Sequence, residues 1–350
     1  MFNSRIHTTL LRVQLWTIII LCAVSCCDDK WSVNPDDVQL GREFRVRTFY
    51  KDIQDLPPND SVAVEKLIRV YGEFWVDYSE DILKIGAFND TSTVGELRRF
   101  LQHESTIETL AAIDTTSGSQ DKISQVSIEL ENSFKRFHAL MPTEPVPDII
   151  LMSSGFNNSV YPREEYLAIG LEMFIGHDHP ILEKLPPDMF PQYRRMRMHP
   201  DLLSISAFRG WMLVNFQNRG YTGQMLADDI LYWGKVLWLT KKCMPDMHEH
   251  LFLDWTPNEL KWAKANENAI WIELQPSDVI FETNRTIYNR WLIEGPFTRA
   301  GSIPQESPDK LGIWMGWQII EDYMKANPNT TIDELFDERD PSVFLRTYRP

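Results

Sequence analysis

The stretch DIILM, residues 148–152, decides the fold class, because it is a short, largely apolar run directly behind the proline-containing segment 142–147. A run of this length bounded by prolines is typical of a buried β-strand. The stretch YLAIG, residues 166–170, has the same character and follows a turn predicted at Asn157-Asn158. We therefore predict a small sheet in the middle of the chain.

Helical patterns lie on both sides of this sheet. Before it, apolar residues repeat at helical spacing from Val64 to Trp75, and further patterns cover 93–103 and 121–140. After it, helices are predicted over 201–218, 223–242, 257–274, 277–292 and 308–326. Ser307 is expected to cap the last helix, with Pro308 in its first turn. The sequence thus predicts an α+β fold that is mostly α-helical, with a small β-sheet in the middle.

The N-terminus has the pattern of an export signal. Arg5 and Arg12 precede an apolar stretch, 15–24, that is far shorter than the roughly 20 residues a membrane-spanning helix needs. The following Ala23-Val24-Ser25-Cys26 matches a bacterial lipoprotein signal, in which the Cys26 thiol receives diacylglycerol before cleavage. An ordinary secretory signal is the alternative. We predict lipidation at Cys26, since exposed thiols at a free N-terminus would serve no structural purpose.

These features predict the organisation of the whole chain. Residues 1–25 are the signal peptide, 26–45 the lipidated N-terminus and tether, and 46–350 a single globular domain. The expected location is the bacterial cell envelope, with the N-terminal lipid holding the protein on a membrane. Whether that membrane is the inner or the outer one stays open.

Composition excludes some classes of protein. Residues 1–25 carry two of the 35 basic residues and none of the 50 acidic ones, so the remaining chain has a net charge of −17. Such a surface disfavours nucleic-acid binding and attraction to anionic lipid, so the anchor must be covalent. After cleavage, Cys26, Cys27 and Cys243 are the cysteines that remain, which is too few for a disulfide framework or a C-x-x-C site.

Motifs for catalysis are absent: the chain has no G-x-G-x-x-G, Walker loop, G-x-S-x-G or H-E-x-x-H. Ser307 and Lys310 match S-x-x-K, but helix capping explains the serine. The segments 177–179 (His-Asp-His) and 248–250 (His-Glu-His) offer metal-ligand chemistry, yet both are predicted as polar loops beside prolines. We therefore predict no catalytic residue, no metal site and no cofactor.

One helix carries a candidate binding surface. Asp228, Tyr232 and Lys235 share a face by spacings of four and three in an otherwise apolar helix. They could line a polar groove together with Arg194, which lies in a basic and aromatic stretch, 190–195. The alternative is that the three helical residues form a solvated face or a structural polar cluster.

Several strings resemble a known family. They are GLEMFIGHD (170–178), FPQY (190–193), the helix from Asp228 to Gly234-Lys235, GPFT (295–298) and LGIWMGWQI (311–319). Together they cover most of the mature chain and resemble the gliding motility-associated lipoprotein GldB family of Bacteroidetes. The resemblance implies a cell-envelope lipoprotein needed for gliding, whose partners are proteins of a motility machinery, and it supplies no catalytic residues.

That family is in turn distantly similar to predicted zinc proteases of the gluzincin type. The order of elements agrees, with a small sheet followed by helices at 201–218 and 223–242. The metal-binding part differs completely from that of the zinc proteases. The segment Ser206–Trp211 contains no histidine, and Trp233 stands near the position expected for a ligand glutamate. The resemblance therefore implies a metal-free, gluzincin-like scaffold kept for binding.

Three functions follow as hypotheses. The leading one is a membrane-anchored, non-enzymatic component of the gliding motility apparatus that holds a partner in the groove near Arg194, Asp228, Tyr232 and Lys235. The alternative is an envelope hydrolase with an unrecognised site, which requires acidic or histidine side chains that converge in one cleft. A periplasmic chaperone would instead expose broad apolar surface.

Overall fold

The computed structural model describes residues 30–56 and 61–350. The predicted signal peptide and Cys26 lie outside the described residues. The chain divides into two units, Met1–Val33 and Asn34–Pro350, and the description that follows concerns the second.

A mixed four-stranded sheet has the order β1-β2-β4-β3. The strands are β1 (Val46–Arg47), β2 (Asp148–Met152), β3 (Val160–Pro162) and β4 (Tyr166–Gly170). β2 pairs in parallel with β1 and β4, and β3 pairs antiparallel with β4. The two predicted strands are confirmed, and the two short edge strands were not predicted because they have little apolar periodicity.

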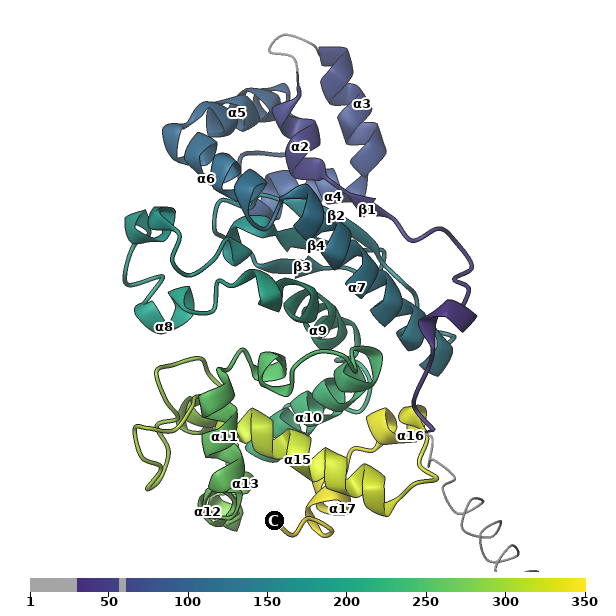
Figure 1. The fold of residues 1–350 in the computed structure, drawn as a ribbon, viewed down its shortest axis with the longest axis vertical. Coiled ribbons are helices and arrows are strands. Elements are labelled where there is room, and N and C mark those ends of the chain that lie inside the picture. The colour runs from purple at the N-terminus through teal and green to yellow at the C-terminus, as the bar shows by residue number, and fades with distance from the viewer. Residues whose placement is uncertain (1–29, 57–60) are drawn as a thin grey trace, which may run out of the picture. The chain divides into compact units, whose positions relative to one another are not determined.

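Helices precede and follow the sheet (Figure 1). Before β2 lie η1 (Pro35–Asp37), α2 (Phe49–Gln54), α3 (Ser61–Tyr71), α4 (Glu73–Asp77), the π turn η2 (Tyr78–Ile82), α5 (Thr91–Gln102), α6 (Glu104–Thr115) and α7 (Gln120–Leu140). Between β4 and the first long helix of the C-terminal half lie η3 (Leu171–Phe174), η4 (Pro180–Lys184), α8 (Gln192–Arg195) and η5 (Pro200–Leu202). The rest are α9 (Leu203–Asn215), α10 (Leu226–Cys243), η6 (Glu249–Leu253), α11 (Pro257–Ala265), α12 (Glu267–Leu274), α13 (Ser277–Ile280), α14 (Arg285–Tyr288), η7 (Asn289–Trp291), α15 (Leu311–Ala326), α16 (Ile332–Asp337) and α17 (Pro341–Leu345). The predicted α+β class is confirmed.

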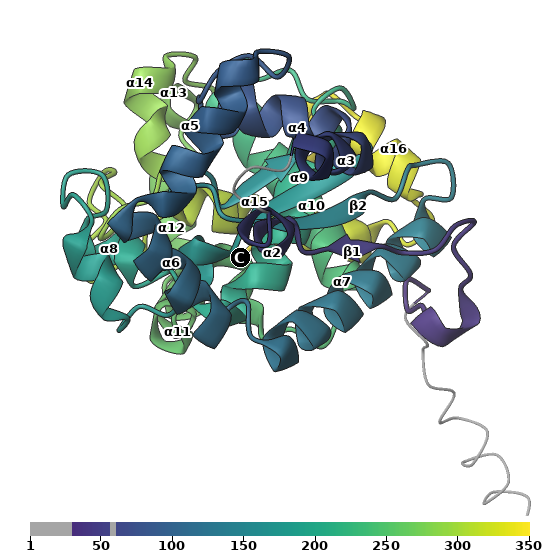
Figure 2. The same cartoon turned by 90° about the horizontal axis from the view of Figure 1, so that it is seen from above.

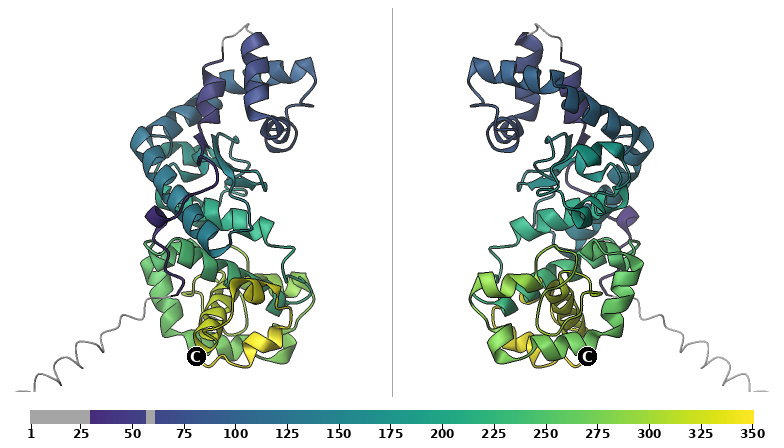
Figure 3. Two further views of the ribbon diagram at one scale, coloured as in Figure 1. Left: turned by 90° about the vertical axis from the view of Figure 1, so that its right-hand side faces the viewer. Right: turned by 90° about the vertical axis from the view of Figure 1, so that its left-hand side faces the viewer.

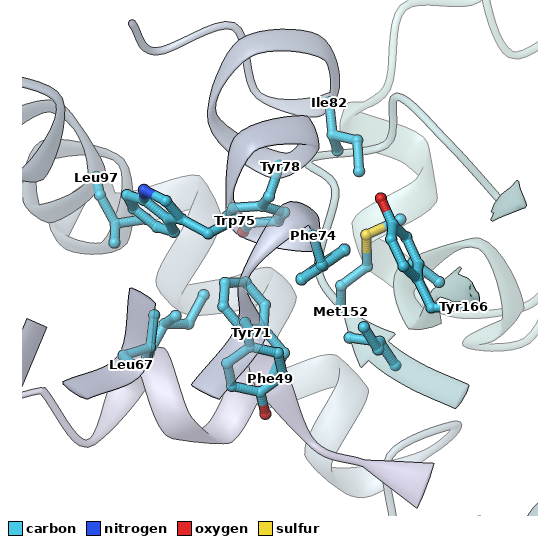
Figure 4. Packing of buried hydrophobic residues seen from close by; sticks show 13 residues of the cluster. Phe49, Leu67, Tyr71, Phe74, Trp75, Tyr78, Ile82, Leu97, Met152 and Tyr166 are labelled. Atoms are coloured by element: carbon cyan, nitrogen blue, oxygen red, sulfur yellow. The ribbon is translucent and has the colours of Figure 1, made fainter. Parts of the chain in front are cut away.

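One face of the sheet packs on an aromatic cluster. Successive side chains of a strand point to opposite faces, and Ile150 and Met152 of β2 join this cluster. The ring of Phe49 on α2 lies edge-on to three rings at its centre, with centroid distances of 4.6–4.9 Å to Tyr71, Phe74 and Tyr78. Figure 4 shows these rings beside Met152, and Figure 2 shows α2 next to β1, viewed nearly along the helix axis.

The opposite face carries the buried residues Ile149 and Leu151, and on this side α9 packs against β3 and β4. The indole Nε1 of Trp211 on α9 donates a hydrogen bond to the carbonyl oxygen of Arg163, 2.9 Å away, just before β4. The same indole lies edge-on to Phe134 of α7, 5.3 Å between centroids. This contact ties α7 and α9 to the sheet.

The C-terminal helices gather around α10 and α15, drawn green and yellow in Figure 3. The two helices approach unusually closely because glycines face each other: a Cβ atom on Gly316 would lie 1.8 Å from the carbonyl oxygen of Ile230. A Cβ atom on Gly234 would lie 2.3 Å from the carbonyl oxygen of Gly316. Within the described ranges, none of the helices is both long and apolar enough to cross a membrane.

Some predicted helices differ from the observed ones. The helix expected over 277–292 is wrong, because this segment forms the short pieces α13, α14 and η7, and the helix expected over 257–274 is broken at Asn266. The start predicted for the last helix is also wrong. α15 begins at Leu311, after Lys310 in the left-handed conformation, and Ser307 does not cap it.

Candidate binding site

The three predicted residues of α10 do come together. Asp228, Tyr232 and Lys235 line one cavity of about 10 Å³, which is too small for more than a water molecule. All three are buried. Their spacing therefore predicted a shared face correctly, and the contacts of that face are with other parts of this chain.

Each of the three has an internal partner. Asp228 accepts hydrogen bonds from the backbone N–H groups of Gln224 (2.9 Å) and Met225 (3.3 Å), and so it caps the start of α10. The Tyr232 hydroxyl donates to the carbonyl oxygen of Leu213, 2.6 Å away. The Asp228 bonds thus stabilise the start of α10, and the Tyr232 bond fixes α10 against the end of α9.

Lys235 is held by the C-terminal segment. Its Nζ donates to the carbonyl oxygen of Glu338 at 2.8 Å and lies 4.9 Å from the ring centroid of Phe344. Burial lowers the pKa of Lys235 to about 8, although the carboxylates of Glu338, Asp337 and Asp228 oppose this shift. The cation therefore fastens α16 and α17 to α10.

Arg194 lies elsewhere. It lines a cavity of about 480 Å³, here called the central cavity, whose wall includes Phe156, Arg197, Ser206, Gly210 and Trp233. Its guanidinium donates to the carbonyl oxygen of Met189 at 2.9 Å and faces Glu294 at 3.4 Å. The four predicted residues thus divide between two cavities, and a role for them in binding stays a prediction.

The central cavity is formed where α9 and α10 meet the loop after β2. Ser206 and Gly210 are four residues apart on α9, so they project toward the same side, and Trp233 of α10 lines the same space. Ser206 and Gly210 belong to the segment Ser206–Trp211, which lacks the histidines that the resemblance to zinc proteases would imply, and Trp233 stands near the position that it implies for a glutamate. Beside them stand Phe156, Met189 and Phe190, and Met189 is 59% exposed.

A buried ionic cluster forms part of the wall of this cavity. Asp254 accepts two hydrogen bonds from Arg209, at 2.9 and 3.0 Å, and one from Lys310 Nζ at 2.9 Å. Burial alone would raise the pKa of Asp254, but the charges of Arg209 and Lys310 outweigh it and hold the pKa well below its usual value. The carboxylate is therefore ionised, as its two cationic partners require.

A second carboxylate extends this cluster. Asp309 is fully buried and accepts hydrogen bonds from Arg197 (2.6 Å), the Trp255 indole N–H (3.1 Å) and the Gly295 N–H (2.9 Å). Burial alone would lower the pKa of Arg197, but the Asp309 carboxylate outweighs this effect, so the pKa is raised.

The backbone of this cluster is strained at two residues. Asp254 and Lys310 both have positive φ, 57° and 55°, and their side chains form an ion pair with each other.

A further cavity of about 550 Å³ shares Arg197 and Asp254 with the central cavity and is here called the histidine cavity. It brings together His177 and His250, one from each predicted histidine segment, and His199, which the sequence reasoning missed. The rings of His177 and His199 stack with centroids 5.8 Å apart. In the described part of the chain, no three His, Cys, Asp or Glu side chains are grouped so that they could hold a metal ion.

The loop that closes the central cavity is organised by Glu172. This fully buried carboxyl accepts hydrogen bonds at Oε1 from the Ser154 N–H (2.6 Å) and the Phe156 N–H (3.0 Å), and burial raises its pKa. Gly155 and Phe156 both have positive φ, 66° and 62°. Glu172 thus holds a strained turn that places the Phe156 ring in the cavity wall.

Sequence reasoning missed Arg197, Arg209, Asp254, Asp309 and Glu172. The available signal was the position of single charged residues within apolar stretches, as in the segments 171–175 and 252–255, because buried charges there require partners. The partners themselves are distant in sequence, so the sequence did not reveal the cluster.

The comparisons with known proteins agree with the resemblance found in the sequence. The family model described as gliding motility protein GldB matches residues 28–350, which include every residue of both cavities. No curated protein and no solved structure matches the chain. The chain belongs to the family of the gliding motility protein GldB.

Proposed function

We propose that this protein is a lipid-anchored component of the cell envelope that takes part in gliding motility as a non-enzymatic binding scaffold. The family match over residues 28–350 carries the assignment to motility. The pattern Ala23-Val24-Ser25-Cys26 supports the lipid anchor. The family's distant similarity to zinc proteases, with Ser206, Gly210 and Trp233 in the central cavity, supports a scaffold that binds without metal chemistry.

The central cavity is the proposed binding place. Its rim combines the exposed, apolar Met189 with an ion pair between Arg194 and Glu294 whose side chains are both partly exposed. An apolar side chain of a partner can enter beside Phe156, while Arg194 and Glu294 at the rim can exchange their weak mutual pair for polar contacts. A peptide segment of a motility protein is the occupant that fits this combination.

The test substitutes residues at the rim of the central cavity and measures gliding. Arg194→Ala and Met189→Asp should reduce gliding strongly, while the amount of protein in the cells stays at the level of the wild type because both side chains are exposed. Arg290→Ala is the matched control, since Arg290 is also exposed and its Nε donates only to the nearby carbonyl oxygen of Ile287 at 2.7 Å. Normal gliding in the Arg194 and Met189 variants would overturn the central cavity as the binding place.

A hydrolase is the second candidate, and one observation favours it: three histidines from distant segments line the histidine cavity. Residues 28–350, purified without tag or chelator, should be analysed for bound metal. Near-stoichiometric zinc that is lost in His199→Ala would favour the hydrolase over the scaffold. A preparation without metal would contradict the zinc-dependent form of this alternative.

A further inference from the structure

The buried ionic cluster in the wall of the central cavity contains more cations than carboxylates. Its cations are Arg197, Arg209 and Lys310, and its carboxylates are Asp254 and Asp309. Each of these five side chains is at most 13% exposed. Buried charges in proteins are normally paired, because an unmatched charge is costly to remove from water. The cluster therefore carries one positive charge that its own carboxylates do not neutralise.

The acid at the rim of the cavity does not supply the missing negative charge. Glu294 lies 3.4 Å from Arg194, and both side chains are partly exposed, so these two balance each other. Over its whole lining, the central cavity has the arginines 194, 197 and 209 but only the acids Asp254 and Glu294. The chain as a whole has a net charge of −15, so a positive lining is a local exception, and it attracts anions.

Arg197 has hydrogen-bond donors available for such an anion. A guanidinium carries five N–H donors in a planar fork. Across the described ranges, Nη1 of Arg197 donates to Asp309 at 2.6 Å, and neither Nε nor Nη2 has an acceptor. Neither of these two nitrogens is closed off from solvent, and Arg197 lines the central cavity. Asp309 therefore fixes the fork, while its other donors remain available to a ligand in the cavity.

The rest of the lining indicates which anion fits. The apolar side chains Phe156, Met189 and Phe190 line the same cavity as Arg197, so the anionic group must be attached to an apolar one. A carboxylate carries one negative charge and accepts two parallel hydrogen bonds from a guanidinium. A phosphate group carries about 1.5–2 negative charges and would exceed the single unmatched positive charge. A carboxylate beside an apolar side chain therefore fits the cavity best.

We propose that Arg197 binds an ionised carboxylate of the partner peptide, and that an apolar side chain of the same peptide packs beside Phe156. The proposal rests on the proposed function, since it names the chemistry of the peptide that the central cavity binds. The carboxylate can belong to an acidic side chain or to the C-terminus of the peptide, and the test distinguishes these two sources. The ion pair between Arg197 and Asp309 stays intact, because the ligand uses other donors of the same guanidinium.

The test measures the binding of short peptides to the full chain, purified in detergent, by fluorescence anisotropy. Each peptide carries an uncharged BODIPY dye at its N-terminus. The first peptide is Gly-Ala-Glu-Phe with an amidated C-terminus, and the second is Gly-Ala-Gln-Phe, also amidated, which lacks any carboxylate. The third is Gly-Ala-Gln-Phe with a free C-terminal carboxylate. The two carboxylate peptides thus differ from the amidated Gln peptide in one group each.

We expect at least one carboxylate peptide to bind with a dissociation constant about tenfold lower than that of the amidated Gln peptide, the effect of a hydrogen bond to a charged group. The tighter of the two carboxylate peptides identifies the source of the carboxylate. Arg197→Lys should remove most of this preference, because lysine can keep the ion pair with Asp309 but has no planar fork for a second carboxylate.

Two variants test the charge balance while Arg197 stays in place. Ser206 lines the central cavity on α9, one turn before Arg209, so Ser206→Asp supplies a carboxylate from the protein itself. Ser206→Asn is the matched control, with nearly the same shape and no charge. Ser206→Asp should lose the preference for carboxylate peptides, and Ser206→Asn should keep it. Without peptide, Ser206→Asp should unfold at the same temperature as Ser206→Asn or higher, because its charge meets the unmatched positive charge.

Three results would overturn the proposal. Equal affinity for all three peptides would show that the cavity does not recognise a carboxylate, and so would the absence of binding by either carboxylate peptide. Unfolding of Ser206→Asp clearly below Ser206→Asn would show that the cluster has no unmatched positive charge. These results leave the proposed function standing, because the gliding of Arg194→Ala and Met189→Asp decides it separately.

Discussion

At the scale of single residues, the molecule combines buried charges with strained backbone. Asp254 and Lys310 both adopt the left-handed conformation, which residues other than glycine rarely adopt, and their side chains form an ion pair 2.9 Å long. Each left-handed residue costs of order 1 kcal/mol, and the surrounding contacts must offset this cost. The pair between Arg209 and Asp254, in which one guanidinium nitrogen donates to both carboxylate oxygens, supplies such a contact in the wall of the central cavity.

Lys235 gives a pH-dependent prediction at the same scale. Its pKa is about 8 in the folded protein and about 10.4 in an unfolded chain. Between these values the unfolded state binds more protons, so the free energy of unfolding rises with pH, and this contribution is lost as the pH falls through 8. Chemical denaturation should show that the free energy of unfolding of the wild type, relative to that of Lys235→Met, increases by at most about 3 kcal/mol from pH 8 to pH 10.4.

The comparison with Lys235→Met isolates one group, because all other groups titrate in both proteins. Parallel stability curves for the two proteins over this pH range would contradict a lowered pKa. A parallel gliding assay separates the roles: loss of motility together with loss of stability indicates a structural lysine, and loss of motility alone indicates the predicted role in binding.

At the scale of secondary-structure elements, the contact between α10 and α15 depends on glycines. Gly234, Gly312 and Gly316 bring the two helices and the segment near Trp291 to backbone contact distance. Glycine within a helix is destabilising relative to alanine, so its presence in helices that are otherwise rich in large apolar residues needs a reason. The close approach of the two helices is that reason. The gain is a close packing of two buried helices.

Gly316→Ala should destabilise the protein by about 3 kcal/mol, because the new Cβ would lie 1.8 Å from a backbone oxygen and the helices would have to separate. Gly95→Ala is the matched control. Gly95 is also within a helix, α5, but a Cβ there meets no atom within 4 Å, so this change should stabilise the protein by about 0.5–1 kcal/mol. Urea denaturation of both variants measures the two effects, and equal values for them would contradict the close approach.

At the scale of the whole molecule, attachment to the membrane is predicted to depend on one atom, the Sγ of Cys26. Cys26→Ala should abolish incorporation of radiolabelled fatty acid, because the thioether to diacylglycerol cannot form. Cys27→Ala should leave incorporation unchanged, which makes it the matched control for loss of a neighbouring thiol. Fatty-acid label that persists in Cys26→Ala, or is lost in Cys27→Ala, would contradict the predicted site.

The local part of the fold could be predicted from the sequence. The strands at 148–152 and 166–170 and the long helices α7 and α10 lie where apolar runs and helical periodicity indicate them. Their formation depends on neighbours within a few residues, and the pattern of those neighbours is visible in the sequence. The spacing of Asp228, Tyr232 and Lys235 likewise predicted that they share one face.

The sequence by itself thus determined the α+β class and the family, and it predicts the export and lipidation signals. Only the tertiary structure decided where α15 begins, because Lys310 before it has the left-handed conformation and its side chain pairs with Asp254, which is distant in sequence. It also decided that Arg194 lines a cavity apart from Lys235, and that histidines from three segments line another. These features depend on contacts between distant residues, and no periodicity along the chain specifies such contacts.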